Sequence, residues 1–396
     1  MLRAFFVYLL LITNSNAGYN FAKDFSLQKV NLDLLAQRIT HEVFASEQWP
    51  TTVSYDDRQY KLDYGFDESL TDHVKKLMRR YPSDYTSVVV IENKTGKILT
   101  AVDYDKKQRK YGKNITFSST HPAASIFKVI TAANLLEEGK VDIDTPFRFN
   151  GRSSTLYKSQ LRNRKPNRWT RKIDFAKAFA MSNNVVFGKA AINNLSYEKL
   201  NKMAYKFGFN DNVTSILKTS NSKLFSDNDE YGLAELASGF NRQTMISPVH
   251  GATIASVAAN GGIMKSASVI AKITDVESGR VIWERAPKAE VVMSPEPVQK
   301  LREMMELTVK RGTARGSFRR WIRRNPAFHV GGKTGSITGG LPYGKRDWFI
   351  SYASPSENLE EGISICVMIV NVEKWYIKST LFAREVIDYY FNKKRS

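Results

Sequence analysis

The sequence predicts an α+β fold in which an antiparallel sheet is flanked by helices and carries an inserted all-helical subdomain. A β-hairpin pattern at residues 87–102 precedes a long block of helical periodicity at about residues 122–262, and β-rich runs return only after that block. Strands that lie far apart in the sequence must then share one sheet. That arrangement is typical of α+β proteins rather than of alternating βαβ units.

The segment before the sheet contains two amphipathic helix patterns, at about residues 27–45 and 68–80. We expect residues 18–60 to form a lead-in helix and a linker. The hairpin follows, with β-branched runs on both sides of the polar turn Asn93-Lys-Thr-Gly96.

The last helix of the helical block carries the clearest start signal, because Ser247 can cap its N-terminus and Pro248 fits its first turn. In order, the remaining expectations are helices at 122–138, 174–193, 197–207 and 248–259, strands at 268–275 and 280–284, a helix at 297–310, strands at 348–353 and 363–370, and a helix at 376–391.

The first residues are typical of an export signal. Met1-Leu-Arg3 is followed by nine apolar residues, 4–12, and then by small residues at Ser15 and Ala17. Nine residues are too few to span a bilayer, which takes roughly 20 helical residues. We expect residues 1–17 to be a cleaved signal peptide and the protein to be exported, periplasmic or associated with the cell envelope. The alternative is an uncleaved tether.

The formal net charge of +20 favours a polyanionic partner. For an exported protein the candidates are anionic wall polymers and lipid head groups, and nucleic acid does not fit an export signal. The basic residues concentrate in two stretches, 162–172 and 311–324. Each stretch can be read either as a solvated loop or as a docking surface.

The cysteine and histidine pattern offers no metal site. Cys366 is the single cysteine and lies in an apolar run, so we expect a small core residue and no internal disulfide. The five histidines are widely separated and no Cys/His cluster has metal-ligand spacing. We therefore expect no metal and no cofactor.

The segment 121–139 contains a candidate nucleophile. Ser125 and Lys128 are three residues apart on a predicted helix and so lie on the same face. A lysine whose pKa is lowered by burial can accept the proton of a serine hydroxyl and activate it. The pair alone is weak support, because the chain contains four other Ser-x-x-Lys pairs: Ser26/Lys29, Ser196/Lys199, Ser215/Lys218 and Ser220/Lys223.

Two further motifs follow in order, Ser182-Asn183-Asn184 and Lys333-Thr334-Gly335. Ser-x-x-Lys, Ser-Asp-Asn and Lys-Thr-Gly together are the signature of penicillin-binding proteins and class A β-lactamases, and the second motif here differs only in its central residue. With these motifs and their flanks, roughly residues 60–390 resemble the transpeptidase domain of penicillin-binding proteins. The flanks that share the likeness are 178–188, 245–250, 258–262, 311–314 and 347–349.

The resemblance implies that residues 61–396 form a penicillin-binding transpeptidase domain with the β-lactamase-like fold. Two decoy motifs have other interpretations. Lys94-Thr-Gly96 precedes the nucleophile and is better read as the hairpin tip, and Ser226-Asp-Asn228 lies in a polar run rather than at the end of an apolar helix. A proton relay needs a fixed, partly buried hydroxyl, so we choose Ser182.

The resemblance also implies the reaction of a serine D,D-transpeptidase acting on D-Ala-D-Ala stem peptides of peptidoglycan. Ser125 attacks the peptide carbonyl, Lys128 takes its proton, and D-alanine leaves with a proton returned through Ser182. The backbone N–H groups of Ser125 and Ser336 would form the oxyanion hole. β-Lactams would acylate the same serine and act as covalent inhibitors.

Five residues are expected to bind substrate: one in the second motif, the three of the third motif, and Ser336 directly after it. Lys333 supplies positive charge, and Thr334 and Ser336 supply hydroxyls, for the terminal carboxylate of the peptide. Asn184 can hydrogen-bond the peptide backbone. Gly335 lets the peptide lie flat along the strand edge as an added strand.

Three alternatives remain open at this stage. The third motif continues Ser336-Ile-Thr-Gly-Gly340, a departure from the usual pattern that puts the acyl acceptor in doubt, and water as acceptor would make the protein a D,D-carboxypeptidase. A β-lactamase would need a water-activating group, but Glu198-Lys-Leu-Asn201 is one residue short of the class A pattern and Tyr231-Gly-Leu233 lacks the class D asparagine. The third alternative is a non-catalytic wall-binding scaffold.

Overall fold

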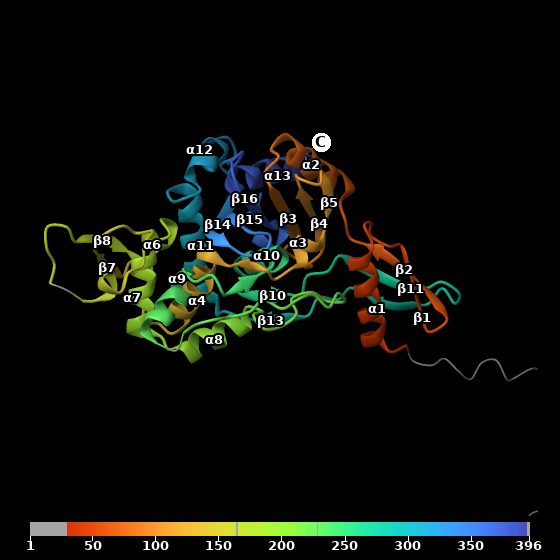
Figure 1. The fold of residues 1–396 in the computed structure, drawn as a ribbon, viewed down its shortest axis with the longest axis horizontal. Helices are drawn as coiled ribbons and strands as arrows, with labels where there is room; N and C mark the ends of the chain where they lie inside the picture. The colour runs from red at the N-terminus through yellow and green to blue at the C-terminus, as the bar shows by residue number, and fades with distance from the viewer. Residues whose placement is uncertain (1–29, 164, 228, 394–396) are drawn as a thin grey trace, which may run out of the picture.

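The computed structural model describes residues 30–163, 165–227 and 229–393, so the expected signal peptide lies outside the described residues. A six-stranded antiparallel sheet forms the centre of the molecule, in the order β14-β15-β16-β3-β4-β5 (Figure 1). Its strands come from both ends of the chain, which confirms the predicted α+β class. They are β3 (Tyr85–Glu92), β4 (Ile98–Asp105), β5 (Lys110–Gly112), β14 (His329–Gly339), β15 (Gly344–Ser354) and β16 (Ile363–Asn371).

Both faces of this sheet are covered by helices. On one face lie α2 (Glu68–Arg80), α12 (Arg315–Arg324) and α13 (Ser379–Lys393), and on the other lies α10 (Pro248–Ala259) (Figure 1). Strand β16 shows the consequence, because its alternate residues belong to two separate apolar clusters. A strand buried on both faces reads as one continuous apolar run, as the sequence of β16 does.

Cys366 belongs to the face of β16 that meets α10, and it is a buried free thiol, as predicted. A Cβ on Gly251 of α10 would lie 3.0 Å from its Sγ. The glycine therefore lets the helix approach the sheet closely. Ser247 caps α10 by accepting a hydrogen bond from the His250 N–H, with Pro248 in the first turn, as the sequence indicated.

The helical subdomain lies beside the sheet and is interrupted where the sequence suggested unbroken helices. The expected helix at 122–138 opens with the 3-10 turn η1 (Ala124–Phe127), and the expected helix at 174–193 breaks at residues 181–183. The subdomain comprises α4 (Lys128–Glu137), α5 (Lys158–Leu161), α6 (Phe175–Ala180), α7 (Asn184–Asn194), α8 (Tyr197–Lys206), α9 (Glu230–Ser238) and α10, with two short ribbons, β6 (His121–Pro122) with β9 (Met245–Ile246) and β7 (Pro146–Phe149) with β8 (Arg171–Asp174).

A smaller sheet near the described N-terminus joins segments far apart in sequence, in the order β1-β2-β11-β12 (Figure 1). Strand β2 (Arg58–Tyr64) crosses the boundary that the sequence suggested at residue 60 and pairs with β11 (Ile270–Asp275). The other two strands of this small sheet are β1 (Thr52–Tyr55) and β12 (Val281–Glu284). The remaining elements of the fold are α1 (Leu32–Ala45), α3 (Asn114–Phe117), β10 (Ile263–Lys265), β13 (Ala289–Val291), α11 (Pro295–Lys310) and η2 (Leu359–Glu361).

Among the described residues, none of the helices has the length and apolar character needed to cross a bilayer.

Candidate active site

Ser125 is presented by a strained turn that leads into α4. The preceding residue, Ala124, has a φ of +52°, a region that residues with a Cβ rarely occupy. Its carbonyl oxygen faces Gly239 at the end of α9, where a Cβ would lie only 1.9 Å away. Glycine is therefore required at position 239, because any side chain would push the turn away. The turn places Ser125 in the wall of an open cleft.

Lys128 lies beneath Ser125 and is fully buried. Its Nζ donates hydrogen bonds to Ser125 Oγ at 2.8 Å, to Asn184 Oδ1 at 2.7 Å and to the carbonyl oxygen of Ser238. None of these acceptors carries a negative charge. Burial, and then the nearby charge of Lys333, hold the pKa of Lys128 well below its ordinary value. When Lys128 is neutral, its amine keeps two N–H donors for Asn184 and Ser238, and its lone pair faces the Ser125 hydroxyl and can take the serine proton.

Ser182 occupies the break between α6 and α7, with a φ of +55°. Its Oγ accepts a hydrogen bond of 2.9 Å from Lys333 Nζ. Lys333 is itself fully buried, and burial lowers its pKa to about 7. The hydroxyl of Ser182 is thus fixed beside a group that can exchange a proton near neutral pH.

The central residue of the second motif has a structural role. Asn183 is the N-cap of α7, where its side-chain oxygen accepts a hydrogen bond of 3.1 Å from the Val186 N–H. Asparagine and aspartate cap helices about equally well. Asparagine in place of the aspartate of Ser-Asp-Asn therefore keeps the helix cap, and with it the local backbone that positions Ser182.

Asn184 connects the base to the segment at residues 153–154, which also lines the cleft. Its Oδ1 accepts from Lys128, its Nδ2 donates to the carbonyl oxygen of Ser154 at 2.9 Å, and its backbone N–H donates to that of Ser153 at 2.8 Å. The sequence assigned Asn184 to the substrate. In the structure both ends of its amide already contact the protein, and one of them holds the lysine amine in place.

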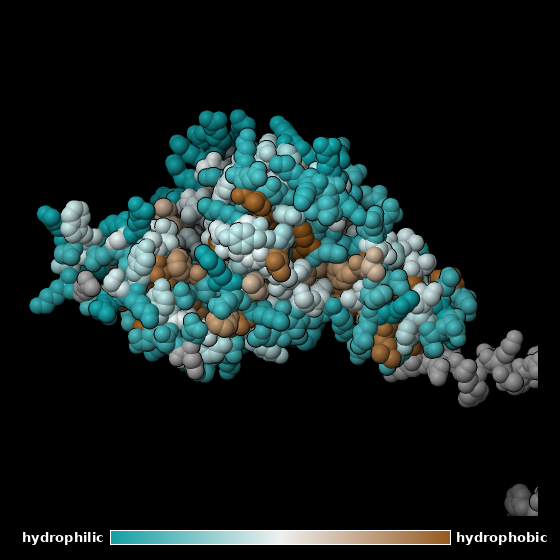
Figure 2. Space-filling view, in the orientation of Figure 1, coloured by the Kyte–Doolittle hydropathy of each residue, from teal (hydrophilic) through white to brown (hydrophobic). Residues whose placement is uncertain are grey.

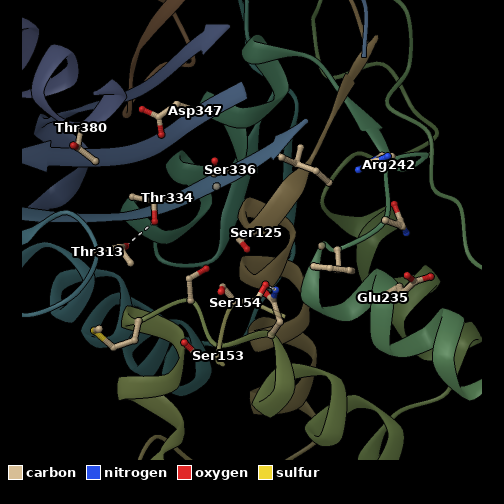
Figure 3. A pocket seen from close by; sticks show the side chains of 18 of the residues that line it. Ser125, Ser153, Ser154, Glu235, Arg242, Thr313, Thr334, Ser336, Asp347 and Thr380 are labelled. Carbon is tan, nitrogen blue, oxygen red and sulfur yellow. Dashed lines mark hydrogen bonds between the residues drawn. The ribbon is translucent and has the colours of Figure 1, made fainter. Parts of the chain in front are cut away.

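The third motif lies on β14, the edge strand of the central sheet. Thr334 and Ser336 pair with Phe349 and Asp347 of β15 on one side, which leaves the other side of the strand open (Figure 3). A Cβ on Gly335 would lie 3.2 Å from both Ala124 Cβ and Ile126 N. The missing side chain therefore lets this face of the strand pack against the nucleophile turn.

The cleft has a volume of about 840 Å³. Lys128 and Lys333 lie below its surface, and six of the eight residues that the sequence proposed contribute to its wall. These six are Ser125, Ser182, Asn184, Thr334, Gly335 and Ser336.

Thr313 and Glu235 are among the further lining residues that sequence reasoning did not assign to the site. Thr313, whose hydroxyl lies 2.6 Å from that of Thr334, belongs to the segment 311–314 that already resembled the family. Glu235 lies on α9, which the sequence did not predict, so nothing pointed to it. Burial and then the charges of Asp227 and Asp229 raise the pKa of this carboxyl.

The decoy motifs lie elsewhere. Residues 94–96 form the turn of the β3–β4 hairpin, and Gly96 has a φ of +69°. Ser226 donates its hydroxyl hydrogen bond to the carbonyl of Asp227. Of the other Ser-x-x-Lys lysines, Lys199 and Lys218 are exposed and form ion pairs with carboxylates.

A serine hydroxyl held against a buried lysine amine, in a cleft bordered by an open strand edge, defines the class of serine acyl-transferases. The sequence profile of the penicillin binding protein transpeptidase domain matches residues 86–380. The chain belongs to this family.

Three relatives illustrate the likeness. Stage V sporulation protein D of Bacillus subtilis is 25% identical over 271 residues, which are 65% of this chain and 40% of that protein. The crystal structure of the D,D-transpeptidase domain of a peptidoglycan glycosyltransferase from Eggerthella lenta has a TM-score of 0.67 at 17% identity and covers 91% of each chain. Penicillin-binding protein A from Mycobacterium tuberculosis has a TM-score of 0.65 at 21% identity, over 83% of this chain and 82% of that one. The two structural likenesses establish a shared fold.

Proposed function

We propose that this protein is a serine D,D-transpeptidase that acts on D-Ala-D-Ala stem peptides of peptidoglycan through an acyl-enzyme on Ser125. The observation that carries the proposal is the 2.8 Å hydrogen bond between Ser125 Oγ and the amine of a fully buried lysine. A protonated lysine could not act as a base, whereas the lowered pKa of Lys128 leaves its lone pair available.

The first half-reaction forms the ester and releases D-alanine. Ser125 Oγ attacks the carbonyl carbon of the penultimate D-alanine while Lys128 takes the hydroxyl proton. The backbone N–H groups of Ser125 and Ser336 donate to the oxyanion, and each such donor contributes about 3 kcal/mol to transition-state stabilisation. The C–N bond then breaks, the leaving amine takes a proton from Ser182, and Ser182 recovers one from Lys333 across their 2.9 Å hydrogen bond.

Substrate orientation is assigned to the edge of β14. The terminal carboxylate of the peptide meets the charge of Lys333 and the hydroxyls of Thr334 and Ser336, and the peptide backbone extends along the open edge beside Gly335. Asn184 lines the cleft, and a contact with the peptide would use the lone pair of its Oδ1 that Lys128 leaves free.

In the second half-reaction an amine of a neighbouring stem peptide attacks the ester carbonyl and gives a proton through Ser182 to Lys333. The ester C–O bond breaks, and Ser125 Oγ takes back the proton that Lys128 holds. The same geometry would serve water as the acceptor, which makes a D,D-carboxypeptidase the second candidate. β-Lactams are proposed as covalent inhibitors, supported by the ceftriaxone and penicillin G acyl-enzyme complexes of penicillin-binding protein A from Mycobacterium tuberculosis. The substrate lies outside the cytoplasm, so we place the protein in the periplasm or cell envelope.

The proposal is tested with the purified protein, a stem pentapeptide ending in D-Ala-D-Ala and an amine acceptor, with products followed by mass spectrometry. Release of D-alanine with a new amide supports the transpeptidase, and release with only the tetrapeptide acid supports the carboxypeptidase. Ser125→Ala and Lys128→Ala should each abolish release, whereas Lys199→Ala, in a decoy Ser-x-x-Lys pair, should not. A wild-type protein that releases no D-alanine would support the non-catalytic scaffold instead.

A further inference from the structure

A basic arm, which we define as residues 146–173, projects from the helical subdomain beyond α6 and α7 (Figure 1). It contains β7, the long connection and β8 up to residue 173; the last residue of β8, Asp174, caps α6. The sequence of the arm contains nine Lys or Arg residues and no Asp or Glu. Positive charges that lie close together repel one another and oppose folding of the segment that carries them. That the arm nevertheless contains a folded ribbon suggests a partner that neutralises these charges.

The charges of the arm face solvent. All eight basic residues of the arm that the structure describes are exposed, and none of them forms an ion pair within the described residues. Hydrophilic side chains accordingly cover this end of the molecule in the space-filling view (Figure 2). The eight are Arg148, Arg152, Lys158, Arg162, Lys165, Arg168, Arg171 and Lys172.

Aromatic rings are placed among these charges. The guanidinium of Arg168 lies 4.8 Å from the ring centroid of Trp169, and that of Arg171 lies 4.4 Å from the ring of Phe149. Trp169 is nevertheless 68% exposed. Guanidinium groups that are pre-oriented on rings present their N–H donors to a phosphate or carboxylate with less loss of side-chain entropy. The exposed ring offers a flat apolar contact beside them.

The arm begins at the rim of the active-site cleft. Ser153 and Ser154 line the cleft, and their carbonyl oxygens accept the two hydrogen bonds from Asn184. The chain then leaves the rim through Tyr157 and α5 toward the basic connection at residues 162–172. A linear ligand bound along the arm would therefore lead into the cleft.

We propose that the basic arm is a docking site for a linear anionic polymer of the cell envelope, with phosphodiester groups along its backbone. A lipid bilayer fits less well, because the large apolar side chains that the arm exposes are Tyr157 and Trp169, whereas an interfacial segment needs a continuous apolar face. Binding at the arm does not depend on the reaction assigned to Ser125.

The test is fluorescence anisotropy of a labelled glycerol-phosphate oligomer titrated with the purified full chain at 150 mM salt. The arm variant is Arg168→Gln/Arg171→Gln/Lys172→Gln. Its matched control is Arg319→Gln/Arg320→Gln/Arg323→Gln, which removes three charges from α12 that are also exposed. Thermal unfolding of both variants verifies that they are folded.

We expect the arm variant to bind roughly tenfold or more weakly and the α12 control to change by less than about threefold. Equal losses in the two variants would show attraction to net charge alone and overturn the proposal. A second result would overturn the proposal in favour of a membrane: the wild type binds vesicles containing phosphatidylglycerol but not the oligomer, and the arm variant loses the vesicle binding. Ser125→Ala should bind the oligomer as the wild type does, so failure of this proposal and failure of the proposed function are separable.

Discussion

Lys333 should control the falling limb of the pH profile for acylation. The side chain is fully buried, donates to Ser182 Oγ at 2.9 Å and to the Thr334 carbonyl at 2.8 Å, and has a pKa lowered by burial to about 7. Its ammonium charge is therefore present below about pH 7 and lost above it. The charged fraction falls from about nine-tenths at pH 6 to about one-tenth at pH 8.

The magnitude follows from the carboxylate that Lys333 is proposed to bind. A hydrogen bond to a charged group contributes about 1.5 to 3 kcal/mol, which corresponds to about 10- to 150-fold in rate. The second-order rate constant for acylation by penicillin should thus fall about tenfold from pH 6 to pH 8. At high pH this rate constant should approach that of the Lys333→Ala variant, whose pH profile should have no falling limb. Because the charge of Lys333 also lowers the pKa of Lys128, the rising limb should move to higher pH in the variant.

The assay is stopped-flow fluorescence with a labelled penicillin between pH 5.5 and 9, repeated with its methyl ester, which has no carboxylate. The ester should react more slowly than the acid and show a smaller falling limb, because only the proton relay through Ser182 then depends on Lys333. The assignment is refuted if the falling limb persists in Lys333→Ala, or if the ester and the acid lose rate equally in the variant.

Three other changes test the nucleophile and its surroundings. Ser125→Ala should abolish labelling by penicillin and leave the melting temperature unchanged, since a partly exposed hydroxyl is removed without opening a cavity; residual labelling would point to another serine. Gly239→Ala should destabilise the protein by about 2 kcal/mol or more and impair acylation, because its Cβ would lie 1.9 Å from the Ala124 oxygen. Gly139→Ala is the matched control, with a similar φ of +62° but no atom within 4 Å of the added Cβ. Equal losses of stability and acylation in the two variants would show that the clash at position 239 is not the cause. Penicillin should remain on the wild type at a 1:1 ratio for minutes or longer by intact mass, and Glu235→Gln should not change that lifetime. Rapid turnover of a chromogenic cephalosporin that Glu235→Gln abolishes would instead identify a water-activating base and a β-lactamase.

The sequence predicted best those elements whose signals are local. The helices at 68–80 and 248–259 begin and end in the structure as the pattern indicated, because periodicity and capping residues specify them. The hairpin of β3 and β4 was likewise marked by its turn. By contrast, β1 and β2 alternate polar residues with few apolar ones. They are stabilised by pairing with each other and by the pairing of β2 with the distant strand β11, so no local pattern revealed them.

From the sequence we predicted which reactive side chains this protein uses. The order and spacing of its motifs placed Ser125 and Lys128 on one turn and identified Lys333, and with them the family. Tertiary structure alone decided what those groups can do. The burial that lowers the pKa values of both lysines, the break that turns Ser182 toward Lys333, and the position of Glu235 in the cleft all arise from contacts between residues that are many positions apart. Desolvation and hydrogen-bond geometry depend on such distant contacts, which no local pattern in a sequence records.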